Sequence, residues 1–463
     1  MSVHDLGSLP AISAITADSR AVTPGCLFAA LPGVKQDGRH FIAEAVAKGA
    51  VAILAPTGTS WPAGVPQRHF ITVPDVRAAL AEIAAGFYAP LPEHLFAVTG
   101  TNGKTSTVDF LRQLLTMAGR RAASIGTLGV VAPDWPPTSS LTTPDPVSLA
   151  RMLGQLAHAG VDDVAMEASS HGLDQRRLDG LRFIAAGFTN LTRDHLDYHG
   201  SMQAYGAAKL RLFTDLVQAG GAVRAMADLE PDILAELRAA ATRQGQDFAQ
   251  VAVELVAPRP EGQIIKINGR EVELPLPGRF QADNAALAVS LAEAVGVSAA
   301  LSCLPHLQGV RGRLQRALVL PNGAAVYVDY AHTPDAIARV LAALRPHTEG
   351  RLHIVFGAGG DRDAGKRPLM GAASAQGADV AIVTDDNPRS EDPALIRKAI
   401  LAACPDSIEI GDRRAAIAAA LEGLAPGDVL VIAGKGHEQG QIIQGEVIPF
   451  DDVAVARELG GMA

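Results

Sequence analysis

The sequence has few of the residues and runs that mark secreted, membrane or nucleic-acid-binding proteins. Its 463 residues include three cysteines, Cys26, Cys303 and Cys404, which lie far apart and form no CxxC pair. This usage indicates a reducing compartment and argues against a metal–thiolate site. The net charge is −9 at pH 7, and no run of Lys and Arg exceeds a few residues. We therefore expect no nucleic-acid partner.

Long apolar segments are also missing. The opening stretch MSVHDLGSLP has no basic region followed by an apolar region, so it lacks the pattern of a secretory signal peptide. No uninterrupted apolar run approaches the ~18 residues that a membrane-spanning helix needs. What is present is a globular composition, with 48% apolar and 19% charged residues. These features predict a cytoplasmic protein that does not contact a membrane.

Strand-like apolar runs alternate with Ala- and Leu-rich helical runs along most of the chain. This alternation predicts an α/β protein whose parallel sheets carry helices on both faces. The expected strands include 95–98, 164–166, 183–188, 325–329, 352–356, 380–384 and 429–433, and the expected helices include 105–118, 335–344 and 392–403. Polar clusters follow several of these strands, at the carboxyl ends where ligands bind in such sheets.

The length favours about three domains, at ~150 residues each. Pro90-Leu91-Pro92 separates a first segment from the strand that leads into GTNGKT, and GVRGRLQRALVLPNG (309–323) has the composition of a hinge before a new strand. We therefore predict domains at 1–90, 91–313 and 314–463.

The stretch HLFAVTGTNGKTSTVDFLRQLL is typical of a strand, a glycine loop and a helix. Backbone N–H groups of such a loop, with the helix N-terminus behind them, surround phosphate oxygens. Lys104 would reach the outer phosphates and Thr105 would ligate Mg²⁺. Val98 takes the first glycine position of the usual GxxxxGK[ST] pattern, and a chance GKT at a helix start is the alternative. The flanking strand and helix favour a nucleotide loop made of Gly100, Thr101, Asn102, Gly103, Lys104, Thr105 and Ser106.

A second polar cluster offers metal ligands. Glu167 leaves a predicted strand just before His171, and its carboxylate suits Mg²⁺, which prefers oxygen ligands. His195 and His199 lie four residues apart, a spacing also found in zinc sites. The HExxH glutamate is absent and no cysteine is near, so we favour magnesium. The alternative for each histidine is hydrogen bonding at a strand end, which we prefer for His199 but not for His195.

Lys209 lies on a predicted helix among Leu210, Leu212 and Phe213. A lysine on a helix is most often a solvated charge. A partly buried lysine can instead lose its proton and react. The residues alone leave both interpretations open.

Taken together, the motifs resemble those of the Mur ligase family, and most closely its branch that makes UDP-MurNAc-tripeptide. The matching segments are GTNGKTS, EASSHGLDQRR, NLTRDHLDYHG, YGAAKLRLF, GRFQADNAALA, GVRGRLQ, DYAHTPDA, GAGGDRDAGKRPLM, DNPR and GKGHE, with DSR and DGR in the first segment. The resemblance implies an N-terminal UDP-MurNAc-binding domain, a central ATPase domain with a P-loop-type parallel sheet, and a C-terminal Rossmann-like domain that binds an amino acid. It also implies a monomer.

The implied reaction is ATP-dependent amide formation in cytoplasmic peptidoglycan precursor synthesis. ATP phosphorylates the D-Glu carboxylate of UDP-MurNAc-L-Ala-D-Glu, and the amine of meso-2,6-diaminopimelate attacks the acyl phosphate. Such a transfer needs its phosphate charge neutralised by Lys104 and Mg²⁺. The resemblance assigns metal binding to Thr105, Glu167, His195 and Lys209, with Lys209 carbamylated to N6-carboxylysine, and chemistry to Lys104, Lys209, His195 and Glu167.

Substrate-binding residues follow from the same resemblance. Contacts to ATP beyond the loop are assigned to Asn284, Arg313, Asp329 and His332. Contacts to the UDP-sugar dipeptide are assigned to Ser19, Thr142, Thr143, Ser169, Gln175 and Arg177. Arg313 and Asp329 lie on either side of the second predicted boundary, as expected if domain closure completes the site. Gln281 departs from the family, which often has Asn there, and a helix-capping turn is the alternative for Thr142 and Thr143.

The segment DNPR is expected to select the incoming amino acid. Diaminopimelate has a carboxylate and an amine at its far end, whereas lysine has only the amine. Arg389 offers a fixed fork for the carboxylate, Asp386 and Asn387 would accept hydrogen bonds from the amine, and Pro388 stiffens the loop. The resemblance adds Arg362, Gly434 and Glu438 to this set. For DNPR alone, a capped turn is the alternative.

Three groups of proteins offer alternative interpretations of these motifs. A lysine-adding Mur ligase or a folylpolyglutamate synthetase shares the ATP core, but DSR, DGR and DNPR argue against both. The second group is an NTP-binding switch or an inactive sugar-nucleotide-binding module. An inactive copy should have lost Lys104, Glu167, His195 or Lys209, and all four are present. An ATP-driven transport subunit would need a signature helix that is not found. The cheapest discriminator is substrate-dependent release of phosphate.

Overall fold

The computed structural model describes residues 11–33, 36–136 and 141–461. The chain forms two compact units, one from residues 1–251 with 290–297 and the other from 252–289 with 298–463. Helix α9 (Arg279–Ala294) contributes residues to both units. The division into three domains stays a prediction.

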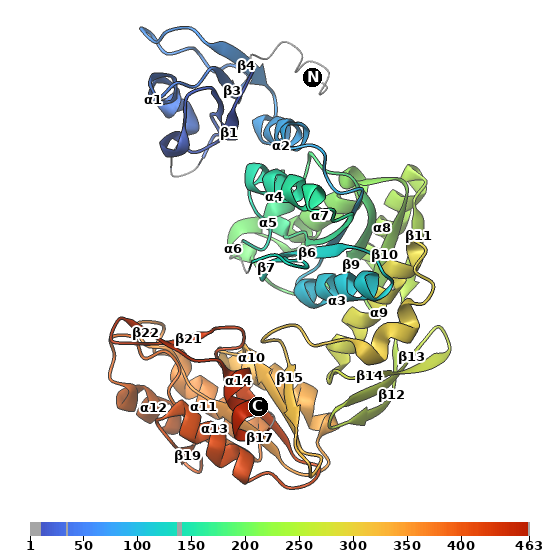
Figure 1. The fold of residues 1–463 in the computed structure, drawn as a ribbon, viewed down its shortest axis with the longest axis vertical. Helices are drawn as coiled ribbons and strands as arrows, with labels where there is room; N and C mark the ends of the chain where they lie inside the picture. The colour runs from blue at the N-terminus through green and yellow to red at the C-terminus, as the bar shows by residue number, and fades with distance from the viewer. Residues whose placement is uncertain (1–10, 34–35, 137–140, 462–463) are drawn as a thin grey trace. The chain divides into compact units, whose positions relative to one another are not determined.

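The first unit begins with a small parallel sheet in sequence order (Figure 1). Its strands are β1 (Ala14–Thr16), β2 (Cys26–Ala29), β3 (Ala52–Pro56) and β4 (His69–Val73), accompanied by α1 (Ile42–Ala47) and α2 (Val76–Phe87). β2 and β3 are apolar and almost wholly buried, as is usual for parallel strands covered on both faces. Asp75 caps α2 by accepting hydrogen bonds from two backbone N–H groups of its first turn.

The larger sheet of the first unit carries the predicted phosphate loop. Its seven strands run in the order β11–β10–β9–β5–β8–β6–β7, and β7 alone is antiparallel to its neighbour. They are β5 (His94–Thr99), β6 (Ala122–Gly126), β7 (Gly129–Val131), β8 (Asp163–Glu167), β9 (Phe183–Phe188), β10 (Val217–Met226) and β11 (Asp247–Val251). Because β5, β6, β8 and β9 are mutually parallel, their carboxyl ends meet at one edge of the sheet.

Helices accompany this sheet, and most of them bury apolar side chains. They are α3 (Lys104–Met117), α4 (Pro146–His158), α5 (Ser170–Asp174), α6 (Leu196–His199), α7 (Met202–Arg211) and α8 (Pro231–Gln244). α3 follows β5 directly and buries Phe110, Leu111 and Leu114. The loop between β5 and α3 is therefore held at both ends by buried elements.

The second unit contains a small antiparallel sheet and a six-stranded sheet. The small sheet consists of β12 (Glu254–Arg259), β13 (Gly262–Ile267) and β14 (Arg270–Leu274). The larger sheet has the order β15–β16–β20–β17–β18–β19 and is parallel except for the edge strand β15. Its strands are β15 (Gln315–Val319), β16 (Ala325–Asp329), β17 (Leu352–Phe356), β18 (Val380–Val383), β19 (Ile408–Glu409) and β20 (Val429–Ala433).

Helices cover both faces of the six-stranded sheet. One core contains apolar residues of α10 (Pro334–Leu344), α11 (Lys366–Gly377) and α12 (Pro393–Leu401). The opposite core contains those of α13 (Arg413–Glu422) and α14 (Asp452–Leu459). A hairpin of β21 (Gly440–Ile443) and β22 (Glu446–Pro449) follows β20. The predicted α/β class with helices on both faces of parallel sheets is confirmed.

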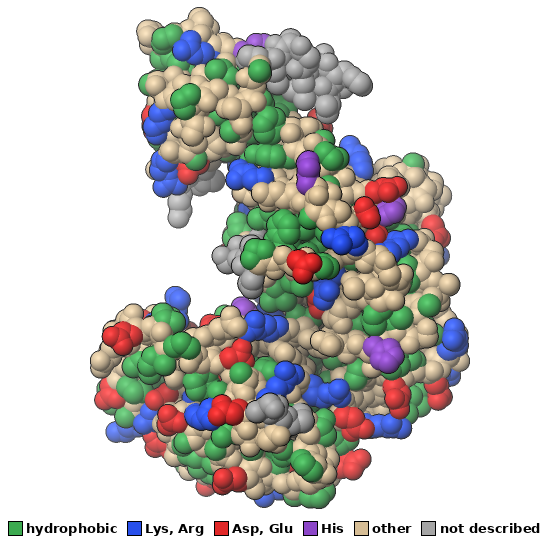
Figure 2. All heavy atoms as spheres, viewed as in Figure 1, with side chains coloured by type: hydrophobic (Ala, Val, Ile, Leu, Met, Phe, Trp, Pro, Cys, Tyr) green, Lys and Arg blue, Asp and Glu red, His purple; other side chains and the backbone are tan. Residues whose placement is uncertain are grey.

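Charged side chains of both signs are distributed over the surface that Figure 2 shows, as the small net charge of the sequence leads one to expect. On the visible face, Lys and Arg side chains are interspersed with Asp and Glu side chains (Figure 2). Among the residues that the structure describes, each helix is too short or too polar to cross a bilayer. Strands 183–188, 325–329, 352–356 and 429–433 match their predicted bounds, whereas the small antiparallel sheet was not predicted.

Candidate active site

The phosphate loop depends on two glycines. Gly100 has φ 144° and Gly103 has φ 84°, backbone conformations that favour glycine. A Cβ at Gly100 would lie 1.8 Å from Thr189 Oγ1, so no larger residue fits there. The half-buried Lys104 folds back over the loop and donates to Gly100 O (3.0 Å) and Thr101 O (2.9 Å). Burial lowers the pKa of Lys104, while the charges of Glu167 and Asp194 oppose that shift.

Residues that follow β9 hold the loop in place, and sequence reasoning missed them. Asn102 N donates to Asn190 Oδ1 (2.9 Å), and Thr189 Oγ1 donates to Asn102 O (2.6 Å). Thr101 N donates to Asn190 O (2.8 Å). The signal was available, because Thr189 and Asn190 directly follow a predicted strand. These bonds hold the loop in one backbone conformation.

Glu167 lies beside the start of α3. Its Oε1 accepts hydrogen bonds from Thr105 Oγ1 (3.0 Å) and from Thr127 N (2.7 Å). The side chain is 2% exposed, and this burial raises the pKa of Glu167 against the opposing charge of Lys104. A Cβ at Gly126 would lie 2.1 Å from Oε1, so glycine leaves room for the carboxylate. Thr127 was not predicted.

The oxygens of Thr105 and Glu167 fit a magnesium ion. Magnesium usually takes one or two protein carboxylates and completes its shell with water and substrate phosphates. In the described ranges, no group of three or more His, Cys, Asp and Glu side chains is arranged to hold a metal by itself.

Lys209 is buried, which favours a reactive lysine over a solvated charge. The side chain is 1% exposed on α7, and Nζ donates to Gly100 O (2.7 Å) and lies 4.4 Å from the centre of the Tyr205 ring. Burial, helped by the nearby charge of Lys104, lowers the pKa of Lys209 to about 6. It is therefore not a solvated surface charge, and most of it is a neutral, nucleophilic amine at pH 7.

Three histidines gather near α6. The ring of His171 lies 4.8 Å from that of His195 and 5.5 Å from that of His199, between centroids. His195 has φ 51°, and its Nε2 lies 3.5 Å from Asp194 Oδ2. Burial and the other two rings lower the pKa of His171. His199 Nε2 is buried without a hydrogen-bond partner among the described residues.

The residues assigned to the UDP-sugar dipeptide fall into two groups. Thr143 Oγ1 donates to Glu167 O (2.8 Å), and Arg177 donates to Thr143 O (2.6 Å). Three more of these residues belong to the same network. Thr142 Oγ1 lies 3.1 Å from Thr127 Oγ1, and Ser169 N donates to Thr143 Oγ1 (3.0 Å). Gln175 Oε1 accepts from Arg177 Nη2 (2.7 Å). Ser19 lies elsewhere in the fold, after β1, where its Oγ meets Glu44 Oε2 (3.5 Å).

In the second unit, polar residues follow β16. Asp329 accepts hydrogen bonds from Leu314 N (2.7 Å) and Ala331 N (2.9 Å). Burial raises the pKa of Asp329, and these two N–H groups and the Arg313 charge oppose the shift. His332 Nδ1 donates to Tyr330 O (2.8 Å), and the Arg313 guanidinium lies 5.2 Å from the centre of the Tyr330 ring.

Gln281, which departs from the family pattern, joins the predicted residues of this unit. Its side chain accepts from Asn284 Nδ2 (3.4 Å) and donates to Arg313 O (3.3 Å). Both amide side chains are buried. The glutamine therefore links α9 to the segment that precedes β15.

The DNPR segment follows β18 and lies beside the loop after β20. Asn387 Nδ2 donates to Glu438 Oε2 (2.8 Å). Its Oδ1 already accepts from Lys435 Nζ (3.0 Å) and Ile442 N (2.9 Å). Both lone pairs of this oxygen are therefore engaged within the protein, and its expected hydrogen bond from an amine stays a prediction. Lys435, in GKGHE, was not predicted as a site residue.

Arg389 is held in place by backbone contacts. It has φ 52°, its N donates to Ile442 O (3.0 Å), and its Nη1 donates to Gly360 O (2.8 Å). Asp386 is 7% exposed, and a Cβ at Gly434 would lie 2.4 Å from its Oδ2, so Gly434 must be small. Pro388 is buried and Arg362 is exposed. The predicted residues thus come together at the carboxyl ends of β17, β18 and β20.

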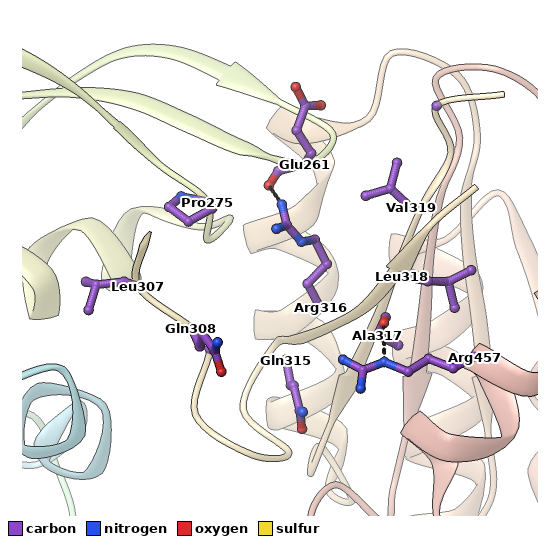
Figure 3. A pocket seen from close by; sticks show the side chains of 12 residues that line it. Glu261, Pro275, Leu307, Gln308, Gln315, Arg316, Ala317, Leu318, Val319 and Arg457 are labelled. Atoms are coloured by element: carbon purple, nitrogen blue, oxygen red, sulfur yellow. Dashed lines mark hydrogen bonds between the residues drawn. The ribbon is translucent and has the colours of Figure 1, made fainter. Parts of the chain in front are cut away.

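A separate cavity of about 920 Å³ lies beside the edge strand β15 and was not predicted. Two of its arginines are engaged with backbone, since Arg316 donates to Glu261 O (2.8 Å) and Arg457 to Ala317 O (2.8 Å) (Figure 3). None of the assigned site residues lines it.

Comparison with known proteins places the chain in a family. The model of the Mur ligase family catalytic domain matches residues 11–88, that of the Mur ligase middle domain matches 98–292, and that of the Mur ligase glutamate ligase domain matches 312–436. The UDP-N-acetylmuramoyl-L-alanyl-D-glutamate–2,6-diaminopimelate ligase of Caulobacter vibrioides is 56% identical, over 96% of this chain and 94% of that protein. The ligase of the same name from Rhizobium meliloti is 49% identical, over 97% and 95%.

A solved structure supports this placement. It is a UDP-N-acetylmuramoyl-L-alanyl-D-glutamate–2,6-diaminopimelate ligase that is 32% identical, with a TM-score of 0.77 over 100% of this chain and 99% of that one. The MurF ligase of Thermotoga maritima in complex with ADP shares the fold at 18% identity, with a TM-score of 0.57. The chain belongs to the Mur ligase family.

Proposed function

We propose that this protein is an ATP-dependent amide ligase that adds meso-2,6-diaminopimelate to the D-Glu of UDP-MurNAc-L-Ala-D-Glu. The observation that carries the proposal is the cluster at the end of β5, where Lys104 and Lys209 both donate to Gly100 O and Thr105 donates to Glu167. Such a cluster suits the transfer of a phosphoryl group, and it occurs in a chain that is 56% identical to a diaminopimelate ligase over nearly its whole length.

In this proposal, residues of the first unit handle the phosphates. The N–H groups of residues 100–106 bind the ATP phosphates, and the Lys104 ammonium neutralises charge that develops during transfer. Thr105 and Glu167, with His195, would hold Mg²⁺, which when bound would neutralise further phosphate charge. Asn284, Arg313, Asp329 and His332 are proposed as additional ATP contacts.

We propose that Lys209 acts as a carbamate. Its neutral Nζ attacks the carbon of CO₂, the nitrogen loses a proton to solvent, and N6-carboxylysine forms with one negative charge. The low pKa of this amine supports the step, because only the unprotonated nitrogen can attack. The product would give the site an anionic oxygen ligand where an ammonium would repel a metal.

The remaining residues are proposed to bind the two other substrates. Ser19, Thr142, Thr143, Ser169, Gln175 and Arg177 would bind the UDP-sugar dipeptide. Arg362, Asp386, Asn387, Pro388, Arg389, Gly434 and Glu438 would bind diaminopimelate, with the Arg389 fork facing its distal carboxylate. The proposed setting is the cytoplasm and the proposed assembly is a monomer, which light scattering at working concentration would check.

The decisive experiment is release of phosphate from ATP with UDP-MurNAc-L-Ala-D-Glu and one of three additions: diaminopimelate, L-lysine or no amino acid. Of the three reactions, we expect sustained phosphate release only in the one that contains diaminopimelate. The product should be heavier than UDP-MurNAc-L-Ala-D-Glu by one diaminopimelate residue in the mass spectrum. Turnover with lysine at the same rate would indicate a lysine-adding ligase. Release that needs neither substrate would indicate an NTPase and overturn the proposal.

A further inference from the structure

Lys435 is a fully buried lysine with no role in the proposed mechanism. It follows β20, and its side chain is 0% exposed. Its Nζ donates to Asn387 Oδ1 (3.0 Å) and to Glu438 Oε2 (3.3 Å). Burying an ammonium is costly unless charged and polar partners surround it. The hydrogen-bond partners of Lys435, Asn387 and Glu438, are both residues assigned to the amino-acid site, so the arrangement of this site depends on Lys435.

The Asn387 amide can have only one orientation in this environment. A lysine ammonium and a backbone N–H are donors without any acceptor capacity. The atom that faces Lys435 Nζ and Ile442 N must therefore be the amide oxygen. The amide nitrogen then points to Glu438 Oε2 (2.8 Å), which accepts it. The atom of Asn387 that is left for a ligand is the second hydrogen of Nδ2, which is a donor.

Glu438 is oriented by the same contacts. Its Oε2 accepts from both Asn387 Nδ2 and Lys435 Nζ. The side chain is 34% exposed, whereas that of Lys435 is fully buried. One oxygen of the carboxylate is thus turned inward, and Oε1 is the oxygen that remains for a ligand.

We propose that Lys435 is a positioning residue that fixes the polarity of the amino-acid site, an inference that rests on the proposed function. It makes Asn387 a hydrogen-bond donor and Glu438 an acceptor toward the ligand. The distal carboxylate of the amino acid is then bound by Asn387 Nδ2 and the Arg389 guanidinium, and the distal ammonium by Glu438 Oε1. A ligand with both groups satisfies the site, whereas lysine leaves the donors unpaired, which is costly in a buried site.

The first test is Lys435→Met, which keeps most of the length of the unbranched side chain and removes the charged nitrogen. We expect KM for diaminopimelate to rise about 10- to 100-fold, as for loss of a charged hydrogen bond. We expect KM for ATP and for UDP-MurNAc-L-Ala-D-Glu to stay within about twofold. Lys398→Met, the same change on the exposed side of α12, is the control and should leave all three values unchanged.

A coupling measurement separates positioning from a general structural role. If Lys435 acts through Asn387 and Glu438, adding Lys435→Met to the double variant Asn387→Ala/Glu438→Ala should leave its KM for diaminopimelate nearly unchanged. Independent, multiplying effects would overturn the inference. An equal rise in KM for ATP and in KM for diaminopimelate would also overturn the inference.

Asn387→Asp gives a second test that does not depend on Lys435→Met folding. This variant keeps an oxygen for Lys435 but replaces the outward N–H with an acceptor. We expect KM for diaminopimelate to rise at least about tenfold, since the new oxygen would face the distal carboxylate of the ligand and also Glu438 Oε2, which accepts from Nδ2 in the unmodified protein. A lower KM would show that this atom receives the ammonium and would overturn the inference. If the unmodified protein shows no turnover with diaminopimelate, both the proposed function and this inference fail. If the unmodified protein turns over diaminopimelate and Lys435→Met has the same KM for it, only this inference fails.

Discussion

Replacing Lys209 with alanine tests whether its buried amine becomes a carbamate. A lysine with a pKa of about 6 is roughly 90% neutral at pH 7, whereas an ordinary lysine is neutral in about one molecule of 3,000. Lys209 should therefore react with CO₂ far more readily than an exposed lysine such as Lys398. Because the pKa is lowered, the neutral form prevails above pH 6 and is lost as the pH falls through 6.

The assay is ¹³C NMR of the protein in ¹³C-bicarbonate, combined with activity in CO₂-depleted buffer. We expect a carbamate signal at pH 7.5 that weakens below pH 6 and is absent from Lys209→Ala, and activity that falls at least about 100-fold in that variant. Short carboxylic acids such as acetate should restore part of the activity of Lys209→Ala, because they supply the missing anion. Restoration by methylamine instead, or a carbamate signal that survives the substitution, would refute the reasoning.

Three further predictions concern the phosphate and amino-acid sites. Glu167→Gln keeps the hydrogen bond from Thr105 but removes the charge, so we expect kcat to fall about 100-fold and the Mg²⁺ concentration for half-maximal activity to rise; an unchanged Mg²⁺ titration would contradict this. Gly100→Ala places a methyl group 1.8 Å from Thr189 Oγ1, so KM for ATP should rise at least about tenfold, whereas Gly58→Ala, which meets no atom within 4 Å, is the control. Arg389→Ala should raise KM for diaminopimelate about 100-fold with little change for ATP, and Arg389→Lys should recover only part of the loss; equal loss for both substrates would contradict the assignment.

The strands of the two large sheets could be predicted because they are continuous apolar runs. β9 and β20 are buried along almost their whole length, and such runs, bounded by polar residues, identify parallel strands without any knowledge of their partners. The small antiparallel sheet has a weaker pattern. β12 is largely exposed, so it offers neither a buried run nor a regular alternation for a sequence reader to detect.

The candidate site could be located from the sequence but not assembled from it. GTNGKT and DNPR identify their own loops, since local glycine and proline chemistry determines both. The contacts that support them join distant segments, as when Asn190 holds the phosphate loop and Thr127 holds Glu167. These residues come together only because β5, β6, β8 and β9 are adjacent and parallel. The order of the strands in the sheet cannot be predicted from the sequence of any one segment.

Two buried lysines show why the chemistry of such a residue depends on its partners. Lys209 faces the carbonyl oxygen of Gly100 and the ring of Tyr205, and Lys104 adds a second positive charge nearby. These surroundings disfavour an ammonium, which leaves a nucleophile. Lys435 faces the carboxylate of Glu438 at 3.3 Å and the amide oxygen of Asn387. Those partners hold an ammonium in a fixed place, which suits a residue that orients others and does not react. Both lysines follow small residues in the sequence, in AAK and in AGK. The local sequence therefore does not distinguish the reactive amine from the orienting ammonium, and only the contacts made in the folded protein do so.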